Sequence, residues 1–138
     1  MEREDDRRLI QEGLSGEWER LVFNILANRT NGLVAKGVVA ELLSRWPTPE
    51  SLAHAMVSEV SGVVRSCGLQ NVKARRLVEM SATYLDGDWG MPEDLPGIGR
   101  YGGDSWRIFD GPVEGRSLVR PLDKALKRYM RRGYLGEG

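Results

Sequence analysis

The sequence predicts an all-α fold, a compact bundle of about eight short helices that forms a single domain over residues 1–138. Apolar residues recur at helical spacing along the chain, whereas no window alternates between apolar and polar residues as a strand does. Proline and glycine interrupt these patterns at short intervals, so we expect short connections. An apolar content of 41% is typical of a globular chain with an ordinary hydrophobic core.

The first two predicted helices carry the most regular apolar patterns. In residues 17–28 the apolar side chains lie at i, i+3, i+4, i+7 and i+8, which places them on one helix face. Residues 31–46 repeat the pattern, with Thr30 as the expected N-cap and Pro47 as the stop. The expected core residues of the two helices are Trp18, Leu21, Val22, Ile25, Leu26, Ala35, Val38, Val39, Leu42, Leu43 and Trp46.

The middle of the chain is predicted to form three further helices. A short one begins at Thr48 and Pro49, because proline suits the first helical position. Ser58 is the expected N-cap of the next helix, and Gly68 is expected to end it. A longer amphipathic helix follows over residues 71–86.

The C-terminal part of the chain alternates between turns and two more helices. Residues 87–99 are turn-rich, and a helix is predicted from about Arg100 to Phe109. Residues 110–119 are expected to form a glycine-containing loop. A last amphipathic helix is predicted to start near Pro121.

The stretch LPGIGRYGG, residues 95–103, contains four glycines and one proline at the start of a predicted helix. Free backbone N–H groups at such a helix start, with no side chains in the way, suit a phosphate. Leu95 and Ile98 should pack inward and hold the turn rigid. The pattern is that of a helix–hairpin–helix over about 91–109, which grips a nucleic-acid backbone without reading sequence. A tight turn between helices that binds nothing is the alternative.

Charge and cysteine content exclude several classes of protein. The 20 basic and 20 acidic residues balance, but the basic ones gather near the C-terminus, which permits an anionic ligand on one face or simply a solvated helix. A lone Cys67 can form neither an internal disulfide nor a cysteine-built metal site. Apolar runs are too short for a membrane span, and the charged N-terminus does not resemble a signal peptide. We therefore expect an intracellular protein, in a nucleus or a bacterial cytoplasm, without a bound metal.

The hairpin and four other stretches resemble one known group. LPGIGRYGGDSWRIF is similar to the hairpin of the helix–hairpin–helix (HhH-GPD) DNA glycosylases. Within that superfamily the resemblance is strongest to the catalytic domain of the methyl-CpG-binding thymine/uracil mismatch glycosylases. The four other stretches, which occur in the same order, are LIQEGL (9–14), ILANRTNG (25–32), GLQNVKARRLVEMSATYL (68–85) and VRPLDKALKRY (119–129).

The resemblance assigns the essential carboxylate of the superfamily to Asp123. An aspartate in the first turn of the last helix is stabilised as the anion by the helix dipole. Breaking an N-glycosidic bond builds positive charge on the sugar, which such a carboxylate stabilises while it orients a water. Asp123 would otherwise be an ordinary helix-start acid, and the rival Asp104 receives a structural role.

The resemblance also implies residues that flip and read a base. Arg29 and Leu69 would fill the gap left by a flipped base, and Gln11 and Tyr101 would bind that base in the pocket. Tyr101 is also expected to be a catalytic residue beside Asp123. A glutamine amide matches the imide edge of uracil or thymine. Without the resemblance, these residues would be a helix-end cation, an exposed loop leucine, a surface residue and a packing residue.

Backbone contacts and cofactors follow from the same resemblance. Gly97, Gly99, Arg100 and Lys124 are expected to contact the phosphates of double-stranded DNA, and the protein is expected to act as a monomer. Bifunctional relatives carry a lysine where this chain has Tyr101, which implies monofunctional hydrolysis. No cysteines stand at the C-terminus for an iron–sulfur cluster, so no cofactor is expected.

The expected function is the excision of thymine or uracil, and of 5-hydroxymethyluracil, opposite guanine. The loop over 109–123 is longer than the resemblance predicts, which could displace Asp123. Two alternatives stay open at this stage. One is a catalytically inactive helix–hairpin–helix module that binds DNA, and the other is a helical adaptor whose basic last helix binds an acidic protein.

Overall fold

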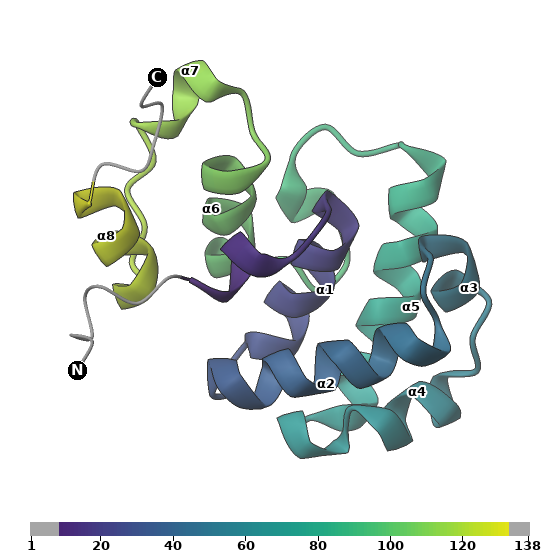
Figure 1. The fold of residues 1–138 in the computed structure, drawn as a ribbon. Coiled ribbons are helices and arrows are strands. Elements are labelled where there is room, and N and C mark those ends of the chain that lie inside the picture. Colours follow the sequence, from purple (N-terminus) through teal and green to yellow (C-terminus); the bar gives the residue numbers. More distant parts are fainter. Residues whose placement is uncertain (1–8, 133–138) are drawn as a thin grey trace.

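The computed structural model describes residues 9–132 and is all-helical, with no strand in that range, which confirms the predicted fold class (Figure 1). Three short 3-10 turns accompany the α-helices: η2 (Ile10–Gly13) precedes the first of them, and η3 (Arg65–Cys67) and η4 (Pro92–Asp94) connect later ones. The α-helices are α1 (Glu17–Ala27), α2 (Gly32–Arg45), α3 (Pro49–Ala53), α4 (Val57–Val63), α5 (Gln70–Asp86), α6 (Arg100–Phe109), α7 (Val113–Arg116) and α8 (Lys124–Arg131).

Helix α1 is the centre of the main hydrophobic core. It packs against α2, α5 and α6, and α5 also packs against α3 and α4 (Figure 1). Leu21 and Leu26 of α1 are fully buried, as are Leu42 of α2 and Leu77 of α5. Each such leucine contributes roughly 2 kcal/mol through burial. The predicted apolar faces of the first two helices are therefore confirmed.

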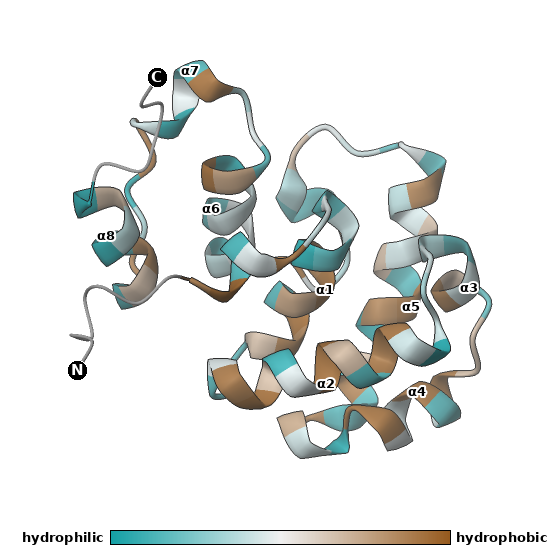
Figure 2. Cartoon of the chain, in the orientation of Figure 1, coloured by the Kyte–Doolittle hydropathy of each residue, from teal (hydrophilic) through white to brown (hydrophobic). Residues whose placement is uncertain are grey.

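A second, smaller core joins α6 to α8. Ile108, Val119 and Leu126 are its buried members, and the rings of Phe109 and Tyr129 pack 4.8 Å apart between centroids. Helix α8 is hydrophilic along much of its length, whereas α1 and α2 carry many hydrophobic residues (Figure 2). The C-terminal helix is thus attached through one apolar edge. Lys124, Lys127 and Arg131 are exposed, whereas Arg128 is half-buried.

Several predicted helix boundaries are wrong. Asn31 caps α2, because its side-chain oxygen accepts hydrogen bonds from the N–H groups of Leu33 and Val34, while Thr30 bonds elsewhere. Met56, not Ser58, precedes α4, so the helix starts one residue before the predicted cap. The last helix starts at Lys124 rather than near Pro121.

Other predicted helix limits agree with the structure only in part. Thr48 caps α3 in the predicted way, and α6 has the predicted limits. Gly68 has a left-handed φ of 71° but follows η3, because α4 already ends at Val63. The predicted loop over 110–119 contains the one-turn helix α7.

An aromatic cluster around Glu17 fixes the start of α1 against α5 and α6. The Glu17 carboxylate accepts hydrogen bonds from Tyr84 Oη at 3.0 Å and Trp106 Nε1 at 2.7 Å. Trp89 stacks on Tyr84 and meets Trp106 edge-on. Burial, followed by the hydrogen bond to Glu17, raises the pKa of Tyr84 to about 12.

This raised pKa predicts a loss of stability at alkaline pH. The unfolded chain releases the tyrosine proton near pH 10, whereas the folded chain holds the Tyr84 proton until the pH is about 12. The contribution is therefore complete below pH 10 and is lost as the pH rises toward 12. Urea unfolding at pH 8 and pH 11 should show a smaller drop for Tyr84→Phe than for the unaltered chain. An equal drop in both would contradict the assignment.

Candidate functional site

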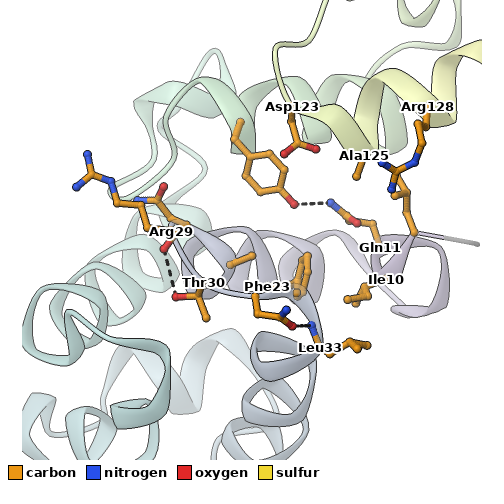
Figure 3. A pocket seen from close by; sticks show the side chains of 15 residues that line it. Ile10, Gln11, Phe23, Arg29, Thr30, Leu33, Asp123, Ala125 and Arg128 are labelled. Carbon is orange, nitrogen blue, oxygen red and sulfur yellow. Dashed lines mark hydrogen bonds between the residues drawn. The ribbon is translucent and has the colours of Figure 1, made fainter. Parts of the chain in front are cut away.

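A pocket of about 560 Å³ lies where the two cores meet (Figure 3). Its walls come from η2, the loop after α1, the start of α6 and the start of α8. Four predicted site residues, far apart in the sequence, line this pocket: Gln11, Arg29, Tyr101 and Asp123. Leu69, Gly97, Gly99, Arg100 and Lys124 do not line it.

Asp123 is the N-cap of α8 and also borders the pocket. Its Oδ2 accepts a hydrogen bond from the N–H of Leu126 at 3.0 Å, so the carboxylate lies at the positive end of the helix dipole. Its Oδ1 makes no hydrogen bond with the described residues. Figure 3 shows the carboxylate on the same side of the pocket as Gln11. Asp123 therefore lines the pocket despite the long loop that precedes it. Capping engages Oδ2 and leaves Oδ1 available for another contact.

Gln11 is held by two hydroxyl groups on α6. Only 3% of the residue is exposed, so it is not the surface residue of the alternative reading. Its Nε2 donates to Tyr101 Oη at 2.9 Å and to Ser105 Oγ at 3.3 Å. Its Oε1 has no hydrogen-bond partner in the described chain. The amide therefore offers an acceptor to the pocket.

Tyr101 keeps its proton at any physiological pH. Burial raises the pKa of its hydroxyl to about 12, and the negative charge of Asp123 adds to this effect. A protonated phenol can donate a hydrogen bond to a carbonyl oxygen.

Ser105 is a site residue that the sequence reasoning missed. It lies one turn after Tyr101 on α6 and is buried. That i, i+4 spacing from Tyr101 was the one available signal.

Arg29 and Leu69 have an unusual backbone conformation in common. They are the two non-glycine residues in 9–132 with positive φ, at 58° and 49°. Such left-handed conformations cost of order 1–3 kcal/mol each and persist only where surrounding contacts hold them. Leu69 is 53% exposed at its loop tip. Figure 3 shows the Arg29 side chain extending away from Gln11 and Asp123.

The hairpin glycines have two different reasons for being glycine. Leu95 and Ile98 are buried, as predicted. Gly97 has a φ of 83°, and a Cβ there would lie 2.9 Å from Arg76 Cβ and 3.1 Å from Ile25 Cδ1. Packing of the hairpin onto α1 and α5 therefore excludes a side chain. A Cβ on Gly99 would meet no atom within 4 Å, so the backbone there is open to a ligand.

The predicted cations lie beside the hairpin and on α8. Arg100 Nε bonds to Asp104 Oδ2 at 3.1 Å, and Arg100 Nη2 donates to the carbonyl of Arg120. Asp104 is mostly buried, bonds to Arg100 and does not line the pocket. Lys124 borders a separate shallow hollow on α8 that is lined entirely by cations, the others being Lys127, Arg128 and Arg131.

The described residues show neither a metal cluster nor a membrane helix. Between residues 9 and 132, no three histidine, cysteine or acidic side chains lie together as metal ligands would. No helix in the same range has both the length and the apolar content needed to cross a bilayer.

Comparison with known families decides the classification. The sequence model of the HhH-GPD superfamily, described as a base excision DNA repair protein family, matches residues 22–138. The chain belongs to this superfamily. The matched region includes the second half of α1 and all of α2 to α8, and therefore the hairpin, Tyr101 and Asp123.

Relatives in the HhH-GPD superfamily have modest sequence identity to this chain. A methyl-CpG-binding domain protein 4-like protein from Arabidopsis thaliana is 28% identical over 112 residues, which cover 81% of this chain and 25% of that protein. A thymine-DNA glycosylase from Aeropyrum pernix is 27% identical over 133 residues, covering 88% of this chain and 59% of that protein. The chain thus spans a quarter to about three fifths of the length of these relatives.

Solved structures share the fold. A thermostable thymine-DNA glycosylase superposes with a TM-score of 0.65 at 21% identity, covering 76% of this chain and 52% of the other. An endonuclease III in a non-covalent DNA complex gives a TM-score of 0.65 at 21% identity, covering 86% of this chain and 66% of the other. At this identity, the likeness concerns the helical fold.

Proposed function

We propose that this HhH-GPD protein is a monofunctional DNA glycosylase that hydrolyses the N-glycosidic bond of thymine or uracil opposite guanine. The observation that carries the proposal is the convergence of Asp123, Gln11 and Tyr101 on one pocket from three distant segments. The matching relative named thymine-DNA glycosylase supports the choice of base. 5-Hydroxymethyluracil has the same imide edge and is a further candidate substrate.

Asp123 supplies the charge that the reaction needs. As the bond between C1′ and the base nitrogen breaks, its electron pair leaves with the base and the sugar becomes cationic. The carboxylate stabilises that cation electrostatically and orients a water, whose oxygen bonds to C1′ while its proton is released. The products are the free base and an abasic site.

Gln11 and Tyr101 discriminate between bases by hydrogen bonding. Because Nε2 of Gln11 is engaged by Tyr101 and Ser105, its Oε1 is available to accept the N3–H of thymine or uracil. The protonated Tyr101 hydroxyl can donate to a pyrimidine carbonyl. Cytosine has no proton on N3 and would leave the Gln11 oxygen unpaired in a buried place, which is costly.

Arg29 and Leu69 replace the flipped base in the duplex. Removing a base from the stack costs a few kcal/mol, which side chains inserted into the gap offset. Both residues lie at loop tips, and Leu69 is an exposed apolar side chain without an evident role in the core. Their left-handed backbone conformations are consistent with loop tips that are preorganised for insertion.

The phosphate backbone of double-stranded DNA would lie across the hairpin and the start of α8. Gly99 offers open backbone at the start of α6, and Arg100 and Lys124 add positive charge. Gly97 belongs to the same turn and sets its shape. A monomer is sufficient, because one chain supplies every group in the scheme.

A cleavage assay tests the proposal. Duplexes containing one G·T, G·U or G·5-hydroxymethyluracil pair are incubated with the protein, and each sample is divided before alkali treatment. We expect strand cleavage only after alkali, because monofunctional hydrolysis leaves an intact abasic strand. Cleavage without alkali would instead indicate lyase activity. Salt-dependent duplex binding with no base release would indicate a DNA-binding module without turnover, and no binding would favour the adaptor.

A further inference from the structure

Lys73 is a buried cation that the proposed chemistry does not use. It lies one turn after Leu69 on α5, and only 3% of the residue is exposed. Its ammonium group donates to the carbonyls of Leu26 at 2.9 Å and Cys67 at 2.8 Å, and to Thr30 Oγ1 at 2.8 Å. All three ammonium hydrogens therefore have acceptors, which is the condition for burying a charge.

The three acceptors lie in or directly beside the two loops that carry the proposed inserting residues. Leu26 and Thr30 lie on either side of Arg29, and Cys67 lies two residues before Leu69. The hydroxyl of Thr30 also donates directly to the Cys67 carbonyl. A continuous network of hydrogen bonds, Lys73–Thr30–Cys67, thus ties one loop to the other beneath their tips.

Helix-end carbonyls offset part of the cost of burying the Lys73 charge. Both backbone acceptors lie at or near helical C-termini, Leu26 in the last turn of α1 and Cys67 at the end of η3, where the partial charge is negative. Burial lowers the pKa of Lys73, and burial raises the pKa of the neighbouring Cys67 thiol. The thiol therefore stays neutral, and the carbonyls rather than a thiolate compensate the ammonium.

We infer that Lys73 and Thr30 are positioning residues that lock the Arg29 and Leu69 loops together, so that both tips enter the duplex in one step. The inference rests on the proposed function and adds to it the source of the loop geometry. Two left-handed residues on exposed loops would relax to ordinary conformations unless anchored. The network beneath them is the anchor that the structure provides. It acts on base flipping and not on the bond-breaking step.

Thr30→Val is the primary test variant, because Lys73→Met would remove the ammonium donor from two buried carbonyls at once and risks unfolding. Valine keeps the shape of threonine and removes the hydroxyl, whereas Thr30→Ser keeps the hydroxyl and serves as the conservative control. Ser81→Ala is the matched control for stability. It removes a buried hydrogen bond from Trp18 Nε1 that lies outside both loops.

Flipping is measured directly with 2-aminopurine placed beside the target base, which brightens when its neighbour leaves the stack. The target carries a 2′-fluoroarabino sugar, because fluorine disfavours the sugar cation and keeps the base attached. At saturating protein, Thr30→Val should give less than half the brightening of the unaltered chain, while Thr30→Ser and Ser81→Ala should match it. Single-turnover release from an ordinary G·T or G·U duplex should fall about tenfold for Thr30→Val, the scale of one lost buried hydrogen bond.

The outcomes separate this inference from the proposed function. Full brightening by Thr30→Val at saturation would overturn the inference and leave the glycosylase proposal standing. An equal loss in Ser81→Ala would also overturn it, because the effect would then reflect stability alone. Neither brightening nor base release by the unaltered chain would overturn the proposed function and the inference with it.

Discussion

Asp123→Asn should lower the rate of base release by roughly 10³-fold without unfolding the protein. The substitution removes the negative charge that would face the sugar cation. It keeps an oxygen that can accept the hydrogen bond from the Leu126 N–H, and asparagine is as good an N-cap as aspartate. Single-turnover excision and duplex binding should be measured on the same preparation, with binding close to that of the unaltered chain.

Asp104→Asn is the matched carboxylate control. Asp104 lies outside the pocket and pairs with Arg100, so this substitution should change the excision rate by no more than a few-fold. The urea midpoint of each variant shows whether folding is intact. Equal losses in both variants, or undiminished excision by Asp123→Asn, would remove the basis for assigning the chemistry to Asp123.

Gly97→Ala should destabilise the protein by about 3 kcal/mol, which combines a left-handed alanine with overpacking. The new Cβ would lie 2.9 Å from Arg76 Cβ, an atom close to the backbone of α5 that cannot move aside cheaply. Urea unfolding measures the change in the free energy of unfolding. A change below 1 kcal/mol would mean that the hairpin does not pack on α1 and α5 as described.

Gly99→Ala tests whether glycine is needed at this position for DNA binding rather than for packing. The new Cβ would meet no atom within 4 Å, so the free energy of unfolding should fall by no more than about 1 kcal/mol, the cost of alanine in place of glycine at this N-cap. Duplex binding should nevertheless weaken if a phosphate approaches this backbone. Unchanged affinity for DNA in Gly99→Ala would move the phosphate contact away from the hairpin.

Local patterns were sufficient for most of the fold. The apolar faces of α1 and α2 were predictable because burial against a common core imposes helical spacing on the sequence. The limits of α6 were predictable from the glycines before it. The caps at Thr30 and Ser58 were wrong, because several neighbouring residues can cap a helix and tertiary contacts choose among them. The Thr30 hydroxyl instead accepts a hydrogen bond from Lys73 and donates one to the Cys67 carbonyl.

The family resemblance was sufficient to predict the candidate site residues. It did not predict the residues that hold them in place. Ser105 and Lys73 are ordinary helix residues by local pattern, and each acquires its role from a partner at least 40 positions away in the sequence. Gly97 was assigned to a ligand, although the structure shows that packing already requires glycine there. Sequence spacing alone cannot distinguish a backbone that meets a ligand from one that meets another helix.

The sequence by itself determined an all-helical chain with a glycine-built hairpin, since periodicity and turn chemistry act over a few residues. Only the tertiary structure decided that Gln11, Tyr101 and Asp123 share one pocket and that Arg29 and Leu69 stand on loops tied by a buried ammonium. The physical reason is that burial, dielectric and hydrogen-bond partners depend on distance in space. Those distances are set when α6 packs against α1 and α8 packs against α6, not by the order of residues along the chain.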